Sequence, residues 1–154
     1  MLNGLLKKEA IELCVDVDNW EEAVRHIGKV MEKAGITSPG YDEAMIQNIK
    51  TFGNYIVIAP GLALPHAFSP ENVIKPGLAL ITLKKPVNFG HEDNDPVKVI
   101  IGVAGTDSTT HLNTMQTLAN ILYENDEKFV EDIWNCSEVE EVMDVISSAN
   151  KQFS

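Results

Sequence analysis

GLALITLKKPVNFGHEDNDPVKVIIGVAG (residues 77–105) contains two short apolar runs with a polar, turn-rich loop between them. The runs, GLALITL (77–83) and VKVIIGVAG (97–105), are rich in Val, Ile and Leu and are bounded by Pro and Gly. That composition is typical of strands whose two faces are both covered. A third run of the same kind, YIVIAP, occupies residues 55–60. We therefore predict a sheet, with Phe89 anchoring the loop between its last two strands.

The chain before these strands has the spacing of helices, and we interpret the N-terminal third as helical. Asp18 followed three residues later by Glu21 resembles a capping box, and apolar residues then recur with the helical period until Gly35. Ser38-Pro39 predicts the start of a second helix, which should end before Gly53.

Helical spacing returns after the strands. Residues 108–124 carry apolar side chains at helical intervals, and Ser137 with Glu140 forms a second capping box. Helices followed by strands and again by helices indicate a central sheet sandwiched between layers of helices. The sequence therefore predicts an α/β fold and one domain that spans residues 1–154.

The composition favours a globular protein. Apolar residues make up 44% of the 154 residues, enough for a hydrophobic core. A net charge of −11 repels phosphate backbones and anionic headgroups; it suits a partner with a basic docking face, and equally suits simple solubility. No apolar run approaches the roughly 20 residues of a membrane span, and charge interrupts the N-terminus too early for a signal peptide. We expect no nucleic-acid partner, no membrane insertion and a cytoplasmic location.

His66 is the first candidate for chemistry, because it follows Pro65 at the end of GLALPHA (residues 61–67). Pro lacks an N–H and fixes φ, so it ends regular pairing and stiffens the backbone that carries the histidine. Ala67 is small and leaves the ring accessible. A neutral imidazole offers a lone pair that can act as a base, a metal ligand or a nucleophile. A solvated histidine in a turn is the simpler alternative.

His111 is the second candidate, in the first turn of the helix predicted to begin near residue 108. The helix dipole and unpaired N–H groups there favour an anion and disfavour a charged ring. Ser108 and Thr109 add donors for phosphate oxygens. A histidine at the edge of the core is the simpler alternative here. Together with His66, however, His111 supplies what a phosphoryl-carrying site needs, which is a nucleophilic nitrogen with donors nearby.

The remaining motifs point less clearly to chemistry. His91 lies among Glu92, Asp93 and Asp95, a set that zinc or manganese could use but that is also typical of a solvated acidic turn. His26 is interpreted as boundary packing on a helix. The sequence contains no GxSxG, P-loop or GxGxxG motif, so serine hydrolases, nucleotide kinases and dinucleotide enzymes lack their signatures.

GLALPHA (61–67) and HLNTMQTLANIL (111–122) together resemble two motifs of the mannitol/fructose-type enzyme IIA domains of the bacterial phosphotransferase system. The likeness extends from about residue 5 to residue 148, and YDEAMIQNIK (41–50) resembles the helical segment that precedes the active-site strand. The resemblance implies a mixed β-sheet between layers of helices and a phosphotransferase activity.

The resemblance also implies a role for each candidate residue. His66 would be the nucleophile and would carry a phosphoryl group on Nε2. His111 would orient it and donate to the phosphoryl oxygens, with Ser108, Thr109 and Asn48 as secondary donors. The group would come from the phosphohistidine carrier protein HPr and pass to a IIB component, and the transfer would need no cofactor and no metal.

Two longer stretches, residues 52–67 and 88–112, favour the ascorbate-type branch of the family. Domains of that branch work with a cysteine-phosphorylated IIB protein and a IIC transporter, whereas the sugar itself is not readable from the sequence. Mannitol-type members carry an arginine near the position of Asn48, which can donate a hydrogen bond but no charge. Lys50 should point elsewhere on the helix, so that arginine's role is not carried over.

Three other functions are compatible with the sequence. One is a regulatory module that receives phosphate as a signal. Another is a metal-dependent enzyme that uses His66, His91 and His111. The third is a scaffold that has kept the shape without any phosphorylation.

Overall fold

The computed structural model describes residues 2–105 and 108–151, without the side chains of residues 2–3, 108–112, 119, 121–126 and 150–151. In chain order the elements are α1 (Leu2–Leu5), β1 (Leu6–Val15), α2 (Trp20–Lys33), α3 (Tyr41–Phe52), β2 (Val57–Ala59), β3 (Leu62–Ala63), the 3₁₀ turn η1 (Pro70–Asn72), β4 (Gly77–Val87), β5 (Val97–Ala104), α4 (Ser108–Trp134) and α5 (Val139–Lys151).

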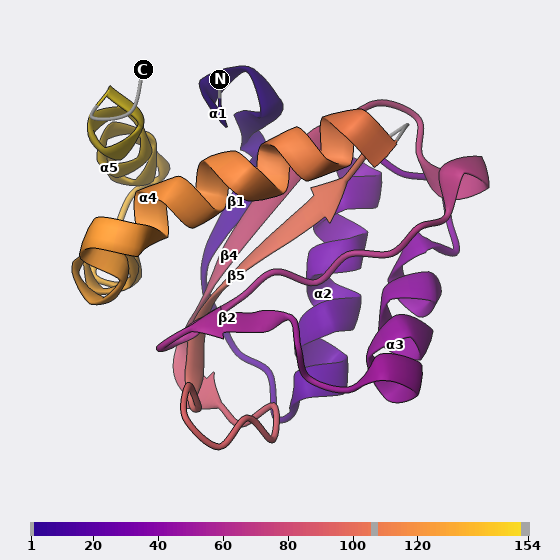
Figure 1. Cartoon of the computed structure of the whole chain (residues 1–154), viewed down its shortest axis with the longest axis horizontal. Coiled ribbons are helices and arrows are strands. Elements are labelled where there is room, and N and C mark those ends of the chain that lie inside the picture. The colour runs from indigo at the N-terminus through magenta and orange to yellow at the C-terminus, as the bar shows by residue number, and fades with distance from the viewer. Residues whose placement is uncertain (1, 106–107, 152–154) are drawn as a thin grey trace.

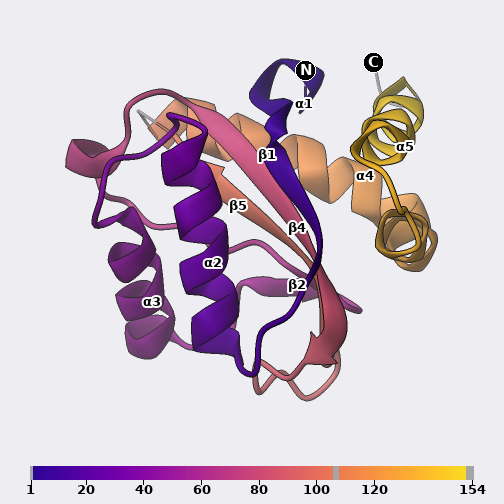
Figure 2. The same cartoon turned by 180° about the vertical axis from the view of Figure 1, so that it is seen from behind.

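The five strands form one mixed sheet with the order β1-β4-β5-β3-β2. β1 is parallel to β4 and β3 is parallel to β5, while the other two neighbouring pairs are antiparallel. α2 and α3 cover one face of the sheet, and α4 and α5 cover the other (Figures 1 and 2). Each face has its own apolar cluster. The predicted α/β fold, a mixed sheet between layers of helices, is therefore confirmed.

The three predicted strands are present as β2, β4 and β5, but the sheet contains two more. β1 lies in the segment that was interpreted as helical, and for residues 6–15 that interpretation is wrong. Its Lys and Glu residues suit a helix locally, yet parallel pairing with the distant β4 buries Leu6, Ala10 and Ile11. Long-range pairing and burial override a weak local propensity.

α2 begins one residue later than predicted. The N-cap is Asn19 and not Asp18: Asn19 Oδ1 accepts the N–H of Glu22 at 2.9 Å, and Glu22 Oε2 accepts the N–H of Asp18 at 2.8 Å. The N-cap bond of a capping box is thus present one residue later than predicted, while the glutamate accepts the N–H of Asp18, the residue before the cap, and not that of Asn19. The predicted stop is confirmed, because α2 ends at Lys33 and Gly35 follows with φ +79.

α3 begins at Tyr41 and not at Ser38-Pro39. The N–H of Ser38 donates to the Asn72 carbonyl at 2.9 Å, so the chain here is tied to the η1 turn. Gly40, with φ +113, turns the chain into the helix. The helix ends at Phe52, directly before Gly53 as predicted.

α4 continues to Trp134, beyond the predicted end near residue 124. Its last side chain is fixed to the sheet, because Trp134 Nε1 donates to the Leu83 carbonyl at 2.9 Å. The loop that joins β4 to β5 is anchored as predicted, with Phe89 buried and its ring centroid 6.2 Å from that of Trp20. In the part of the chain described here, no helix has the length and hydropathy that crossing a bilayer requires.

The capping contact before α5 uses a different glutamate from the one predicted. Glu141 Oε1, and not Glu140, accepts both the N–H and the hydroxyl of Ser137, at 3.1 and 3.0 Å. The helix begins at Val139 and packs beside α4.

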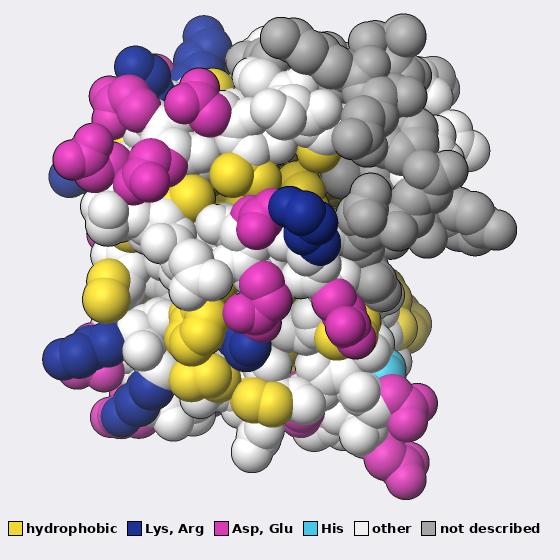
Figure 3. Space-filling view, turned by 90° about the vertical axis from the view of Figure 1, so that its left-hand side faces the viewer, with side chains coloured by type: hydrophobic (Ala, Val, Ile, Leu, Met, Phe, Trp, Pro, Cys, Tyr) yellow, Lys and Arg dark blue, Asp and Glu magenta, His cyan; other side chains and the backbone are white. Residues whose placement is uncertain are grey.

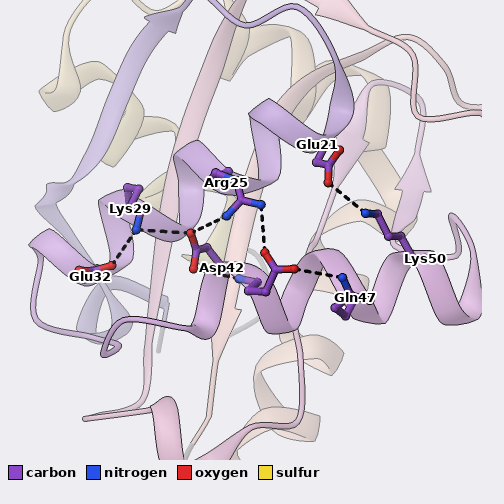
Figure 4. A network of polar contacts seen from close by, with 8 residues as sticks. Glu21, Arg25, Lys29, Glu32, Asp42, Gln47 and Lys50 are labelled. Atoms are coloured by element: carbon purple, nitrogen blue, oxygen red, sulfur yellow. Dashed lines mark hydrogen bonds and ion pairs between the residues drawn. The ribbon is translucent and has the colours of Figure 1, made fainter.

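α2 and α3 meet at Gly28. A Cβ at this position would lie 2.3 Å from the Cβ of Asp42 and 2.9 Å from its Cα, so glycine is what permits the approach. Asp42 is only 5% exposed, and its carboxylate lies 3.3 Å from Arg25 Nη1 and 3.5 Å from Lys29 Nζ (Figure 4). Arg25 also reaches Glu43 at 3.0 Å. A buried carboxylate requires such partners, and the close packing of the two helices provides them.

Tyr41, the first residue of α3, ties that helix to the sheet. Its side chain is fully buried, and its hydroxyl lies 2.7 Å from the Val103 carbonyl and 3.1 Å from that of Ala67. The same oxygen accepts the N–H of Ala67 at 3.2 Å. Burial raises the pKa of Tyr41 to about 12. The hydroxyl therefore joins the segment after β3 to the end of β5.

We predict that Gly28→Ala lowers the free energy of unfolding by about 1–3 kcal/mol, because the methyl group forces α3 away from α2. Gly4→Ala in α1 is the matched control, since a Cβ there meets nothing within 4 Å. Urea unfolding of both variants measures the difference. Equal stabilities would show that the helices separate without cost.

Tyr41→Phe should lower the free energy of unfolding by about 1–3 kcal/mol, because the Ala67 N–H and the Val103 carbonyl lose a buried partner. Since the pKa of Tyr41 rises from 10.0 to about 12 on folding, its protonated hydroxyl stabilises the fold fully below pH 10. That contribution is lost as the pH rises towards 12. The free energy of unfolding of Tyr41→Phe should therefore fall less than that of the wild type over this pH range. Urea unfolding across this pH range tests both statements, and identical curves for the two proteins would contradict them.

Candidate functional site

The GLALPHA segment carries His66 along β5. Leu62 and Ala63 pair in parallel with β5, and after Pro65 the pairing resumes as a bridge between His66 and Val103. Pro65 has no N–H, but its carbonyl accepts the N–H of Val103 at 3.1 Å. His66 therefore lies at the carboxyl end of β5 with its side chain half-buried.

The two ring nitrogens of His66 face different partners. Nδ1 lies 2.8 Å from the Leu64 carbonyl, which can only accept a hydrogen bond. Nδ1 therefore carries the proton, and in the neutral ring Nε2 keeps its lone pair. Nε2 lies 3.3 Å from the hydroxyl of Tyr55. The local backbone thus selects the tautomer whose nucleophilic nitrogen points out of the fold towards the phenol.

Asn48 also reaches this group, from the third turn of α3. Its Nδ2 lies 3.0 Å from the His66 carbonyl and 2.8 Å from the Tyr55 hydroxyl. Lys50, two residues later, points away as predicted and pairs with Glu21 at 3.2 Å (Figure 4). The described cation closest in sequence to Asn48 is therefore engaged elsewhere.

Tyr55 is the residue at this site that the sequence analysis missed. It precedes β2, and its neighbour Ile56 accepts the N–H of Leu64 through its carbonyl at 2.8 Å. This pairing places the Tyr55 ring edge-on to the His66 ring, with centroids 5.6 Å apart and planes at 80°. Tyr55 is eleven residues from His66, and no motif links the two positions. Only the antiparallel turn between β2 and β3 brings them together.

The side chains of His111, Ser108 and Thr109 lie outside the described residues, so their approach to His66 stays a prediction. The backbone of α4 begins at Ser108, four positions after the end of β5 at Ala104. Figure 1 shows this start of α4 just beyond the tip of β5. Since His66 bridges to Val103 near that tip, the helix start and His66 share one end of the sheet.

The other two histidines take part in structural contacts. His26 Nε2 lies 3.1 Å from Glu12 Oε1 on β1, and its half-buried side chain fits the boundary packing predicted for it. His91 Nδ1 accepts the N–H groups of Asp93 and Asn94, at 3.3 and 3.1 Å. These contacts fold the loop on itself.

The carboxylate of Asp95, one of the three acidic residues named with His91, is occupied by the backbone. It accepts the N–H groups of Phe89, Gly90 and His91 at 2.7–3.0 Å. Within residues 2–105 and the described side chains that follow them, no three His, Cys, Asp or Glu side chains gather as a metal site would require.

Large aromatic side chains close in sequence to Tyr55 and His66 are exposed. Phe68, two residues after His66, is 81% exposed, and Phe52, three residues before Tyr55, is 69% exposed. Tyr55 itself is 47% exposed. Aromatic residues are enriched in surfaces that contact another protein.

Comparison with known proteins identifies the family of the chain. The model of the family "phosphoenolpyruvate-dependent sugar phosphotransferase system, EIIA 2" matches residues 4–149. The chain is 38% identical to the ascorbate-specific PTS system EIIA component of Escherichia coli K12 over 149 residues, which is 96% of each protein.

Solved structures of this type have the same fold. The mannitol-specific cryptic enzyme IIA CmtB of Escherichia coli superposes with a TM-score of 0.80 at 28% identity, covering 96% of this chain and 98% of CmtB. The mannitol enzyme IIA of Escherichia coli, solved in a complex with phosphorylated mannitol enzyme IIB, gives 0.78 at 27% identity, covering 94% and 99%. The chain therefore belongs to the EIIA 2 family of the phosphoenolpyruvate-dependent sugar phosphotransferase system, and it is an EIIA phosphotransferase component of that system.

Proposed function

We propose that His66 is the phosphoryl-carrying residue of this EIIA component, which receives the group from a phosphohistidine carrier and passes it to a IIB component. The contacts of the His66 ring carry the proposal. The Leu64 carbonyl holds the proton on Nδ1 at 2.8 Å, so that Nε2 is the nucleophile and is directed towards solvent-exposed Tyr55. No separate base is needed to activate a nitrogen that already has its lone pair.

The chemistry then depends on placement. In phosphoryl transfer the protein contributes mainly positioning and stabilisation of the three equatorial oxygens. The backbone pairing with β5, through the Pro65 carbonyl, fixes the peptide that precedes His66. Asn48 offers an amide at this place, and the start of α4 would offer the N–H groups and hydroxyls of Ser108 and Thr109. His111 would orient the ring and donate to the phosphoryl oxygens.

The proposed partners are HPr as donor, a IIB protein as acceptor and, indirectly, a IIC membrane transporter. The related mannitol enzyme IIA forms a complex with its phosphorylated IIB protein, which supports the second of these. Relatives named as ascorbate-specific support the ascorbate-type branch, with a IIB protein phosphorylated on cysteine. We further propose that residues 1–154 form one domain that acts in the cytoplasm and needs no cofactor for the transfer.

The proposed docking surface is the part of the molecule that carries the exposed rings of Phe52, Tyr55 and Phe68. Figure 3 views the end where α5 and the last part of α4 lie, and shows acidic side chains, some Lys and Arg, and several hydrophobic side chains. Ion pairs such as Lys128–Asp132 and Lys8–Glu140 occupy that end. Phe52 and Phe68, by contrast, flank the site in sequence with exposed rings and suit the apolar centre of an interface.

His66→Ala should abolish phosphorylation, because the attacking nitrogen is removed. The purified protein is incubated with phosphoenolpyruvate, enzyme I and HPr, and intact mass followed by mapping of the modified residue reports the product. His26→Ala is the matched control and should load like the wild type, since His26 contacts Glu12 on β1. A His66→Ala protein that still gains acid-labile phosphate would contradict the proposal. Loading without onward transfer to any IIB protein would instead indicate a regulatory module.

His111→Ala should slow onward transfer to a IIB protein by about 100-fold and slow loading less, because it removes a donor to the phosphoryl oxygens. Single-turnover measurements with the isolated phosphoprotein separate the two steps. Equal effects on both steps, or no effect, would remove His111 from the proposed role.

A further inference from the structure

We propose that Tyr55 is a catalytic residue of the His66 site, holding Nε2 before the transfer and a phosphoryl oxygen after it, with Asn48 positioning its hydroxyl. This inference rests on the proposed function of His66. It concerns a contact that no part of the chain's sequence pattern points to.

The direction of each hydrogen bond follows from the groups involved. The Leu64 carbonyl fixes the proton on Nδ1, so Nε2 can only accept. The amide Nδ2 of Asn48 can only donate, and it lies 2.8 Å from the Tyr55 oxygen. The phenolic oxygen thus accepts a hydrogen bond from Asn48, which leaves its own O–H to donate to Nε2 at 3.3 Å. The result is a one-way chain from Asn48 through Tyr55 to His66.

The hydrogen bond from Asn48 to Tyr55 is shorter than the contact from Tyr55 to His66 Nε2. The bond from Asn48 to Tyr55 has an ordinary length, and the same amide also reaches the His66 carbonyl at 3.0 Å, so the amide is held at both ends. The contact from Tyr55 to Nε2 is long for an O–H donor. A weak bond on the nucleophile is easily exchanged, whereas a hydrogen bond to a charged phosphoryl oxygen is stronger than one between neutral groups.

The transfer step balances without a proton passing through Tyr55. The Nε2 lone pair of His66 forms the new bond to phosphorus, and the bond from phosphorus to the donor's histidine nitrogen breaks with its electron pair staying on that nitrogen. Nδ1 keeps its proton and donates it in a hydrogen bond to the Leu64 carbonyl. That bond stabilises the positive charge that the ring then carries. The Tyr55 O–H turns from Nε2 to a phosphoryl oxygen and stays protonated.

Burial and charge at this place favour a neutral donor. Tyr55 is 47% exposed and reaches the side from which a donor protein must approach. The nearby cation Lys50 is paired with Glu21, and Arg25 is paired with Asp42 and Glu43. Among the described side chains of α2 and α3, Asn48 is therefore the one that supports the site with a hydrogen bond, which it donates to the Tyr55 hydroxyl.

The decisive variant is Tyr55→Phe, which keeps the ring and removes only the hydroxyl. We expect the equilibrium of phosphoryl exchange with HPr to shift towards unphosphorylated chain by about tenfold, because one hydrogen bond to a charged group is lost. The maximal loading rate should fall as well. The equilibrium constant is measured from the phosphorylated fractions in mixtures of the two proteins. It does not depend on docking, so a surface role of the exposed ring would leave it unchanged.

Asn48→Ala tests the positioning role. The exchange equilibrium should shift in the same direction by a smaller factor. In free energy the double variant Asn48→Ala/Tyr55→Phe should shift it by less than the sum of the two single shifts, since the amide acts partly through the Tyr55 hydroxyl and also bonds the His66 carbonyl. Additive shifts would assign Asn48 an independent role and overturn that part of the inference.

The outcomes separate this inference from the proposed function. If the wild-type chain takes up no phosphate on His66, the proposed function fails, and Tyr55 loses its role with it. If the wild type is phosphorylated and Tyr55→Phe shows the same equilibrium and the same maximal rate, the inference is wrong while the proposed function stands. Phe68→Leu is the control for docking, because it changes an exposed ring that lacks a hydroxyl; it should leave the exchange equilibrium unchanged.

Discussion

The parallel pairing of residues 62–66 with β5 is the interaction on which the rest of the site depends. At its start the Gly61 carbonyl accepts the N–H groups of Lys98 and Val99, and at its end Pro65 accepts that of Val103. Gly61 has φ +80, which lets the chain reverse from β2 into this pairing. Successive side chains of a strand face opposite sides, so a slip of one residue would turn the histidine away from α3. The buried Tyr41 hydroxyl opposes such a slip, because it bonds to Val103 on β5 and to Ala67 on the paired segment, next to the bridge.

This arrangement gives the site a nucleophile without a dedicated base. The tautomer of His66 is set by a backbone carbonyl two residues earlier, which is part of the same turn that places the ring. The partners that meet the ring from α3 and from the start of β2 are an amide and a phenol, and both are uncharged. A carrier must release what it accepts, and neutral donors hold a phosphoryl group less tightly than a cation would. The charged residues of α2 and α3 pair with each other instead (Figure 4).

Errors in the sequence interpretation have identifiable physical causes. β1 was interpreted as helix because its Lys and Glu residues suit a helix, and the strand that overrides this preference, β4, lies far away in the chain. The cap of α2 and the glutamate that meets Ser137 each lie one residue after the predicted position, because neighbouring Asp, Asn and Glu residues offer equivalent local patterns and packing selects among them. The apolar runs of β4 and β5 were recognised correctly, since burial on both faces leaves a continuous signal in the sequence. The run of β2 was recognised too, although Ile58 on this edge strand is exposed.

The sequence by itself determined the fold class and the order of most elements, and it singled out His66 as the candidate for chemistry, because apolar periodicity and the Pro-His motif are local patterns. It could also indicate that Asn48 offers a donor without a charge. Only the tertiary structure decided which ring nitrogen of His66 is exposed, and that Tyr55 faces it. Those facts depend on the register between β2, β3 and β5, and a register is fixed by contacts between residues that are distant in the chain rather than by any one stretch of it.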